Sequence, residues 1–93
     1  MNNIHNLTIV IVTYRTDEKI LKDCLDSVDP QVKILLIENS KSIAFKEKLE
    51  KIYPNLNVVL SGSNLGYGAG NNFGLSRVKT KFVLILNFSV KSP

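Results

Sequence analysis

Four short apolar runs divide the chain, and β-branched residues are frequent in each of them. The first two runs, at residues 7–14 and 32–37, are nearly continuous rather than alternating, which is typical of strands buried on both faces of a parallel sheet. Two shorter runs follow at residues 58–60 and 82–86. The pattern therefore predicts four buried strands.

Helical spacing of apolar residues separates these strands. We expect a first helix capped by Thr16, with acidic residues in its first turn, where the helix dipole favours negative charge. A second helix is predicted over residues 42–52 and ends before Pro54. A third is expected within the glycine-rich stretch that starts at residue 61, ending near Val78. The expected inward positions are Ile20, Leu21, Cys24, Leu25 and Val28 in the first helix, and Ile43, Ala44, Leu49 and Ile52 in the second.

The resulting order is βαβαβαβ, which predicts the α/β class with an open parallel, Rossmann-like sheet. The 93 residues suffice for one small domain, and no repeat or linker divides them. We therefore interpret residues 1–93 as a single domain.

The composition excludes some kinds of functional site. Cys24 is the one cysteine and His5 the one histidine, so these residues form neither an intrachain disulfide nor a Cys/His zinc site. The net charge of +4 suits an anionic ligand or an anionic membrane surface. The start lacks a signal-peptide pattern, and no apolar run approaches the ~20 residues of a membrane span. We expect a cytoplasmic protein, with the inner face of the membrane as an alternative place, and no nucleic-acid partner.

Ligands of open α/β sheets bind outside the carboxyl ends of the strands. Polar residues follow three of the predicted strands, so we expect them along one edge: Thr13, Tyr14 and Arg15; Glu38 and Asn39; and residues 61–66. Tyr14 either stacks on a base or covers the end of the core. Arg15 is either a phosphate clamp or a solvated loop residue. Glu38 either accepts hydrogen bonds from a ribose hydroxyl or a base N–H, or serves as a cap or surface ion pair.

The glycine-rich stretch matches neither common phosphate-binding motif. The dinucleotide pattern G-x-G-x-x-G fails because its last position falls on Asn71 or Phe73, and the P-loop pattern fails because no glycine here precedes a lysine. Asn71 and Asn72 are poor residues for a helix interior. They either contact a polar ligand or cap the helix, in which case the glycines only allow it to pack closely on the sheet.

Four segments together resemble family 2 glycosyltransferases of the GT-A fold, especially the rhamnosyltransferase-like branch. They read TIVIVTY at 8–14, ILLIENS at 34–40, NLGYGAGNNFG at 64–74 and FVLILN at 82–87. The resemblance covers nearly all of this chain but only the N-terminal part of a usual family member. It implies binding of a UDP- or dTDP-sugar and transfer of the sugar to a polysaccharide or glycan acceptor.

By this resemblance, Thr13 and Tyr14 line the nucleotide base, and Glu38 stands where the family usually has aspartate. Asn64, Gly66 and Asn71 border the nucleotide-sugar pocket. The family also implies a divalent metal, Mg²⁺ or Mn²⁺, on the donor diphosphate. Its usual aspartate ligand is replaced here by Ser89, whose neutral hydroxyl is a poor ligand for such ions.

The family's general base and acceptor site lie beyond these residues, so we expect no catalytic residue here. The chain then resembles a truncated donor-binding half that lacks its C-terminal half and is weakly active or inactive alone. Two alternatives stay open. One is a non-catalytic nucleotide- or sugar-binding module, and the other is an interaction domain whose exposed sheet edge drives self-association.

Overall fold

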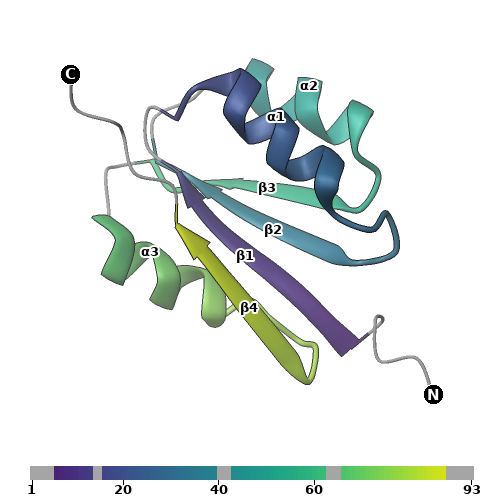
Figure 1. Cartoon of the computed structure of the whole chain (residues 1–93). Helices are drawn as coiled ribbons and strands as arrows, with labels where there is room; N and C mark the ends of the chain where they lie inside the picture. The colour runs from purple at the N-terminus through teal and green to yellow at the C-terminus, as the bar shows by residue number, and fades with distance from the viewer. Residues whose placement is uncertain (1–5, 14–15, 40–42, 63–65, 88–93) are drawn as a thin grey trace.

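A computed structural model describes residues 6–13, 16–39, 43–62 and 66–87 of the chain. Strands and helices alternate along it (Figure 1). Their order confirms the predicted βαβαβαβ arrangement. The elements are β1 (Leu7–Thr13), α1 (Glu18–Ser27), β2 (Lys33–Glu38), α2 (Ile43–Ile52), β3 (Leu56–Leu60), α3 (Gly66–Leu75) and β4 (Phe82–Asn87).

The four strands form one parallel sheet in the order β3-β2-β1-β4. β1 and β2 occupy the centre, and both are almost entirely buried, as their continuous apolar runs predicted. The second strand begins and ends one residue later than expected, and the third begins two residues earlier, at Leu56. These are shifts of strand ends, where the apolar pattern carries least information.

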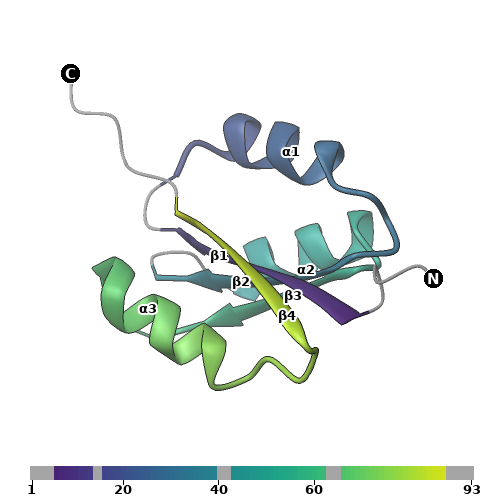
Figure 2. The ribbon, with the colours of Figure 1, turned by 60° about the horizontal axis from the view of Figure 1, so that its bottom comes forward.

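Helices cover both faces of the sheet. α1 and α2 lie on one face and α3 on the other (Figure 2). The face toward α1 and α2 carries the larger core, and a smaller cluster packs beneath α3. The larger core includes Ile9, Ile11, Leu21, Leu25, Ile34, Leu36, Phe45, Leu49 and Val58, and the smaller one is built on Val10, Val12, Leu35 and Ile37.

The start of α1 corrects the predicted cap. Asp17, rather than Thr16, is the N-cap residue, because its Oδ1 accepts hydrogen bonds from the backbone N–H groups of Lys19 and Ile20 at 2.8 and 3.2 Å. Thr16 is instead buried. An aspartate is at least as good a cap as threonine, and the helix begins one residue later.

The inward faces of the helices also differ from expectation. In α2, Phe45 and Leu49 are the buried residues, whereas Ile43 and Ile52 are 63% and 50% exposed and Ala44 is exposed. Ile20 of α1 is likewise 55% exposed. Phe45 and Leu49 are four residues apart, so they share one side of the helix. Because this side of the helix faces the sheet, the neighbouring isoleucines point toward solvent. α3 ends at Leu75, three residues before the expected position.

The glycines of α3 allow this helix to approach the sheet closely. A Cβ at Gly70 would lie 2.6 Å from Cγ1 of Val12, and one at Gly74 would lie 2.6 Å from Cγ1 of Val10. Both valines are fully buried. Gly68 faces open space instead. Close packing on the sheet therefore explains Gly70 and Gly74, as one of the two interpretations proposed. The other part of that interpretation, that Asn71 and Asn72 cap the helix, is wrong, because both lie inside α3.

Glu50 joins α2 to β3. Its Oε2 accepts hydrogen bonds from the backbone N–H of Val58 at 2.8 Å and from Lys46 Nζ at 2.7 Å, and Lys46 Nζ also donates to the Val58 carbonyl at 2.7 Å. Burial alone would raise the pKa of this carboxyl. The bonds from Lys46 and Val58 outweigh burial and hold the pKa below its ordinary value of 4.5.

We expect Glu50→Gln to lower the free energy of unfolding by about 1 kcal/mol at pH 7. Because the folded-state pKa is depressed, the charge stabilises the fold above the ordinary pKa, and this contribution is lost as pH falls through the folded-state value. Urea unfolding at pH 7 and pH 3 measures the difference. If the wild type and Glu50→Gln differ in free energy of unfolding by the same amount at both pH values, this role of the charge is contradicted.

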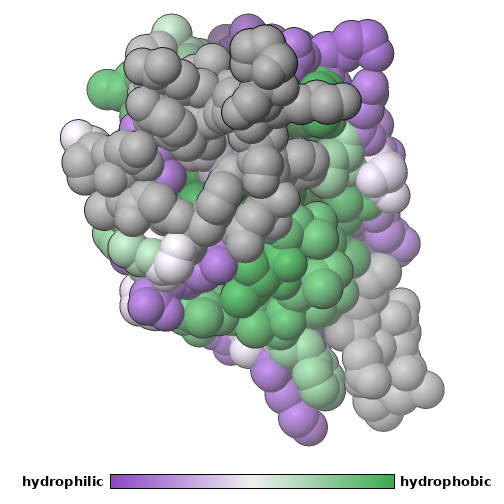
Figure 3. Space-filling view, turned by 60° about the vertical axis from the view of Figure 1, so that its left-hand side comes forward, coloured by the Kyte–Doolittle hydropathy of each residue, from purple (hydrophilic) through white to green (hydrophobic). Residues whose placement is uncertain are grey.

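β4 forms one edge of the sheet and carries exposed apolar side chains on both of its faces. Phe82 and Leu84 are 46% and 48% exposed, and Val83 between them is 39% exposed. Figure 3 shows the hydrophobic surface on the side of the molecule that carries this strand. Within the described residues, no helix is long and apolar enough to cross a membrane.

Candidate functional site at the carboxyl edge of the sheet

The carboxyl ends of β1, β2 and β3 meet at one edge of the sheet. In the parallel register Thr13 lies beside Glu38, and Glu38 lies beside Leu60. The polar residues that end the first two strands are therefore neighbours, although 25 positions separate them in sequence. The other residues predicted at this edge, Tyr14, Arg15 and Asn64, lie outside the described residues, as does Ser89.

A buried hydrogen bond joins the two strand ends. The Thr13 hydroxyl donates to Oε1 of Glu38 over 2.5 Å, and the two residues are 0% and 1% exposed. The Glu38 carboxylate thus lies inside the edge rather than on its surface. A carboxylate at such a position is costly unless it is hydrogen-bonded. Among the described contacts, the Thr13 hydroxyl supplies one such bond.

Asn39 and Ser61 extend this network, although neither was among the predicted binding residues. The backbone N–H of Asn39 donates to the Thr13 carbonyl at 3.0 Å, and that of Ser61 donates to the Glu38 carbonyl at 3.1 Å. Ser61 Oγ also donates to Oδ1 of Asn39 at 2.7 Å. These bonds tie three strand ends together. The sequence signal was present, because both residues are polar, follow predicted strands and were expected along this edge.

A glycine in an unusual conformation follows this network. Gly62 has a φ of +80°, a left-handed conformation that favours glycine. It allows the chain to turn away from the edge immediately after β3. Gly66, one of the predicted site residues, is the first residue of α3, so this helix starts only four residues later.

Two buried oxygen atoms lack hydrogen-bond partners in the described structure. They are Oγ1 of Thr16, which follows β1 closely, and Oδ1 of Asn71, which lies in α3. Buried polar atoms are paired in the great majority of cases, so each exception calls for an explanation. Asn71 is a predicted site residue, whereas Thr16 was predicted only as a helix cap. Both oxygen atoms can accept hydrogen bonds from hydroxyl or N–H groups, and the Thr16 hydroxyl can also donate one.

The described residues do not provide a metal site. Among them, no three His, Cys, Asp or Glu side chains gather closely enough to hold an ion. Glu38 supplies a carboxylate at this edge, but it is buried and bonded to Thr13. Mg²⁺ and Mn²⁺ prefer several oxygen ligands in an open arrangement, which this pair does not match. Cys24 lies apart on α1, where burial raises the pKa of its thiol and makes it a weak nucleophile.

Comparison with known proteins places the chain among the transferases. Residues 8–87 match the model of the glycosyl transferase family 2. The chain is also 28% identical, over 88 residues, to the low-salt glycan biosynthesis hexosyltransferase Agl10 of Haloferax volcanii. This alignment covers 90% of the chain but only 28% of that relative. With its parallel sheet and polar carboxyl edge, the chain belongs to glycosyl transferase family 2.

Proposed function

We propose that the chain forms the part of a hexosyltransferase that binds a nucleotide sugar, with a UDP- or dTDP-sugar as the donor. The observation that carries the proposal is the buried Thr13–Glu38 pair at the carboxyl edge. An ionisable group at the end of an otherwise apolar buried strand lowers stability relative to an apolar residue, and such costs are typical of functional sites. Ligands of open α/β sheets bind at this edge.

Each residue has a role in this proposal. The negative charge of Glu38 orders the Thr13 hydroxyl and favours donors on the ligand, such as a base N–H or a ribose hydroxyl. Asn71 offers an amide oxygen that has no described partner within the protein. Three contacts remain predictions: Tyr14 with the base, Arg15 with the phosphates and Asn64 with the sugar. The acceptor would be a glycan, because the related hexosyltransferase is named for glycan biosynthesis.

We expect weak or no transfer activity from these 93 residues alone. They span 28% of the length of the curated relative they match, and they contain Ser89 where the resemblance implies a metal-binding aspartate. Donor binding should then depend little on a divalent metal. The metal normally neutralises the leaving diphosphate, so its loss affects the transfer step more than binding.

Isothermal titration of UDP and of dTDP, each with and without Mn²⁺, tests the proposal. We expect saturable binding of at least one nucleotide with affinities that agree within about twofold in the two conditions, a difference under 0.5 kcal/mol. Circular dichroism first establishes that the chain is folded. A folded chain that binds neither nucleotide would overturn the donor-site proposal, and binding that requires Mn²⁺ would overturn its metal independence.

The exposed edge of β4 favours the interaction-domain alternative as a second candidate. Unpaired edge strands with exposed apolar side chains promote pairing with another chain. We expect concentration-dependent association in sedimentation velocity. Leu84→Lys, which places a charge on the exposed edge, should reduce this association.

The matched control is Ile20→Lys, which changes a comparably exposed apolar residue on α1 and should leave association unchanged. A wild-type chain that stays monomeric at all concentrations would rule this candidate out. Equal effects of the two lysines would show that the surface is not specific to β4.

A further inference from the structure

A hollow lies at the amino ends of the strands, opposite the edge that carries Thr13 and Glu38. Its volume is about 250 Å³. It is bounded by the first residues of β1, β2 and β3 and by the segment that leads from α3 to β4. Leu35, which belongs to the cluster under α3, contributes to its wall. The hollow therefore occupies the part of this sheet face that lies beyond the end of α3.

Among the described residues that line this hollow, the ionisable ones are all basic: Lys33, Arg77 and Lys79. Elsewhere, four lysines of α1 and α2 form ion pairs with acids of the same two helices. In the part of the chain that the structure describes, neither Lys33 nor Lys79 has such a partner. Among the described residues, Lys33 and Lys79 thus place uncompensated positive charge at the amino edge.

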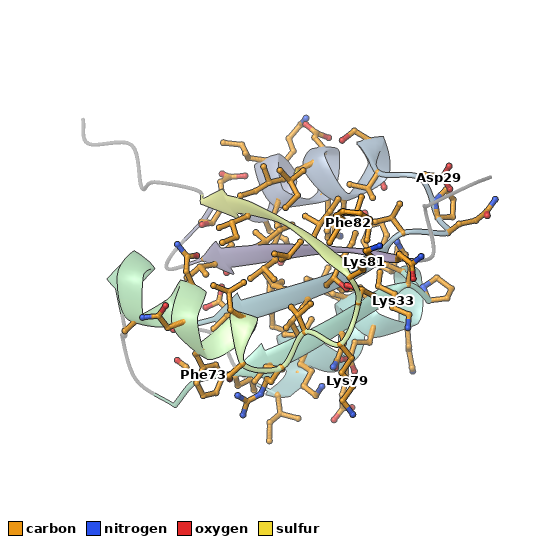
Figure 4. All side chains as sticks on the ribbon, turned by 90° about the horizontal axis from the view of Figure 1, so that it is seen from below. Asp29, Lys33, Phe73, Lys79, Lys81 and Phe82 are labelled. Atoms are coloured by element: carbon orange, nitrogen blue, oxygen red, sulfur yellow. The ribbon has the colours of Figure 1, made fainter. Side chains whose placement is uncertain are left out.

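The sequence and the arrangement in space explain this imbalance. No acidic residue follows Glu50, so the segment from α3 to β4 contains only basic charges. Figure 4 shows Lys33, Lys79 and Lys81 toward the amino ends of the strands. Asp29 lies on the α1 side of the sheet, away from Lys79. Its Oδ1 accepts a hydrogen bond from the backbone N–H of Gln31 at 2.9 Å.

Arg77 is held in a defined position beside the hollow. Its guanidinium lies 3.8 Å from the centre of the Phe73 ring, and Nη1 donates to the Phe73 carbonyl at 3.3 Å. The second contact also offsets the negative end of the α3 dipole, which would otherwise disfavour an anion. Neutral hydrogen-bonding groups complete the lining. The hydroxyls of Thr8 and Thr80 lie 2.6 Å apart, and Asn57 is exposed.

We propose that this basic hollow, formed by Lys33, Arg77 and Lys79, binds the phosphate group of a small ligand. Lysine and arginine form the strong, charge-assisted hydrogen bonds that phosphate oxygens accept, and the Asn57 amide can add a neutral one, whereas the Thr80 hydroxyl already donates to the Phe82 carbonyl at 3.0 Å. The site is separate from the carboxyl edge and does not depend on the proposed donor site. The phosphate group belongs either to a free phosphorylated compound or to a lipid headgroup.

Titration with inorganic phosphate, followed by ¹H–¹⁵N NMR at constant ionic strength with chloride as the reference anion, tests the site. We expect saturable shifts of the amides of Lys33, Asn57 and Thr80 and none at Thr13 or Glu38. Lys33→Gln/Lys79→Gln should weaken phosphate binding by roughly tenfold or more, because it removes two charge-assisted contacts.

The control is Lys19→Gln/Lys51→Gln, which removes the same charge from α1 and α2 and should change the affinity by less than about twofold, under 0.5 kcal/mol. Equal losses in the two double variants would mean that net charge alone attracts the anion. That result, or shifts that do not saturate, would overturn the proposal.

Vesicle sedimentation separates the two sources of phosphate. Binding to phosphatidylglycerol vesicles but not to phosphatidylcholine vesicles, lost in Lys33→Gln/Lys79→Gln, would support the hollow and identify a lipid headgroup. Saturable phosphate binding without vesicle binding would support it and identify a free phosphorylated ligand. Vesicle binding unaffected by these substitutions, together with no phosphate shifts at the hollow, would contradict it.

Discussion

Replacing Gly70 and Gly74 together by alanine is expected to lower the free energy of unfolding by about 2–4 kcal/mol. Each new methyl group would lie 2.6 Å from a buried valine methyl, far closer than normal contact. Overpacking of this kind costs about 1–3 kcal/mol per site, whereas the helix preference of alanine over glycine returns only about 0.5–1 kcal/mol. The net loss should appear as a lower midpoint in urea unfolding.

Gly68→Ala is the matched control within the same helix. Nothing lies within 4 Å of the position its Cβ would take. We therefore expect a gain of about 0.5–1 kcal/mol from helix preference alone. A Gly70→Ala/Gly74→Ala variant as stable as the wild type would show that α3 does not need this close approach. A loss of stability from Gly68→Ala would show that alanine disturbs α3 for another reason.

Glu38→Gln is expected to weaken the binding of UDP or dTDP by roughly tenfold or more, because a charged acceptor contributes more to a hydrogen bond than a neutral one. The side-chain oxygen of glutamine can still accept the bond from Thr13, so the strand ends should stay joined. Isothermal titration measures the affinity, and thermal unfolding checks that the variant is folded.

Glu47→Gln makes the same chemical change on an exposed residue of α2 and provides the control. It should leave the affinity unchanged. If both variants bind equally well, Glu38 has a structural role only. If both bind equally weakly, the effect reflects the net charge of the chain rather than the carboxyl edge.

Much of the fold could be predicted because the central strands have a clear signal. β1 and β2 are buried on both faces, so their sequences are almost continuously apolar, and the parallel α/β arrangement follows from their alternation with helices. The proximity of Thr13 and Glu38 followed from the same argument, since parallel strands end at one edge. Contacts between residues far apart in sequence could thus be predicted where the strand topology alone determined them.

Other features depended on packing that sequence periodicity does not encode. Both Thr16 and Asp17 are capable caps, but in the folded chain Asp17 accepts the capping hydrogen bonds while Thr16 is buried. Helix α2 has several apolar residues that could face the sheet. Phe45 and Leu49 pack against the sheet, and this packing determines the orientation of the helix. Similarly, the glycine pattern did not distinguish Gly70 and Gly74, which contact valines, from Gly68, which does not. Tertiary contacts determine the cap residue, the buried face of α2 and the glycines that meet the sheet.

The basic hollow could not be predicted for a related reason. Lys33 and Lys79 are far apart in sequence, and each resembles an ordinary solvated lysine there. Only the sheet topology, together with the early end of α3, brings them to the wall of one hollow. The net charge of +4 indicated an anionic ligand or surface but not its location.

Mapping UDP binding by ¹H–¹⁵N NMR tests the central claim most directly, because it reports which edge of the sheet receives the nucleotide. The claim predicts saturable shifts of the amides of Thr13, Glu38, Asn39 and Ser61, and these shifts should persist when inorganic phosphate is present to occupy the basic hollow. Shifts confined to Lys33, Asn57 and Thr80 and abolished by phosphate would contradict it, because the nucleotide would then bind through its phosphates at the amino edge alone.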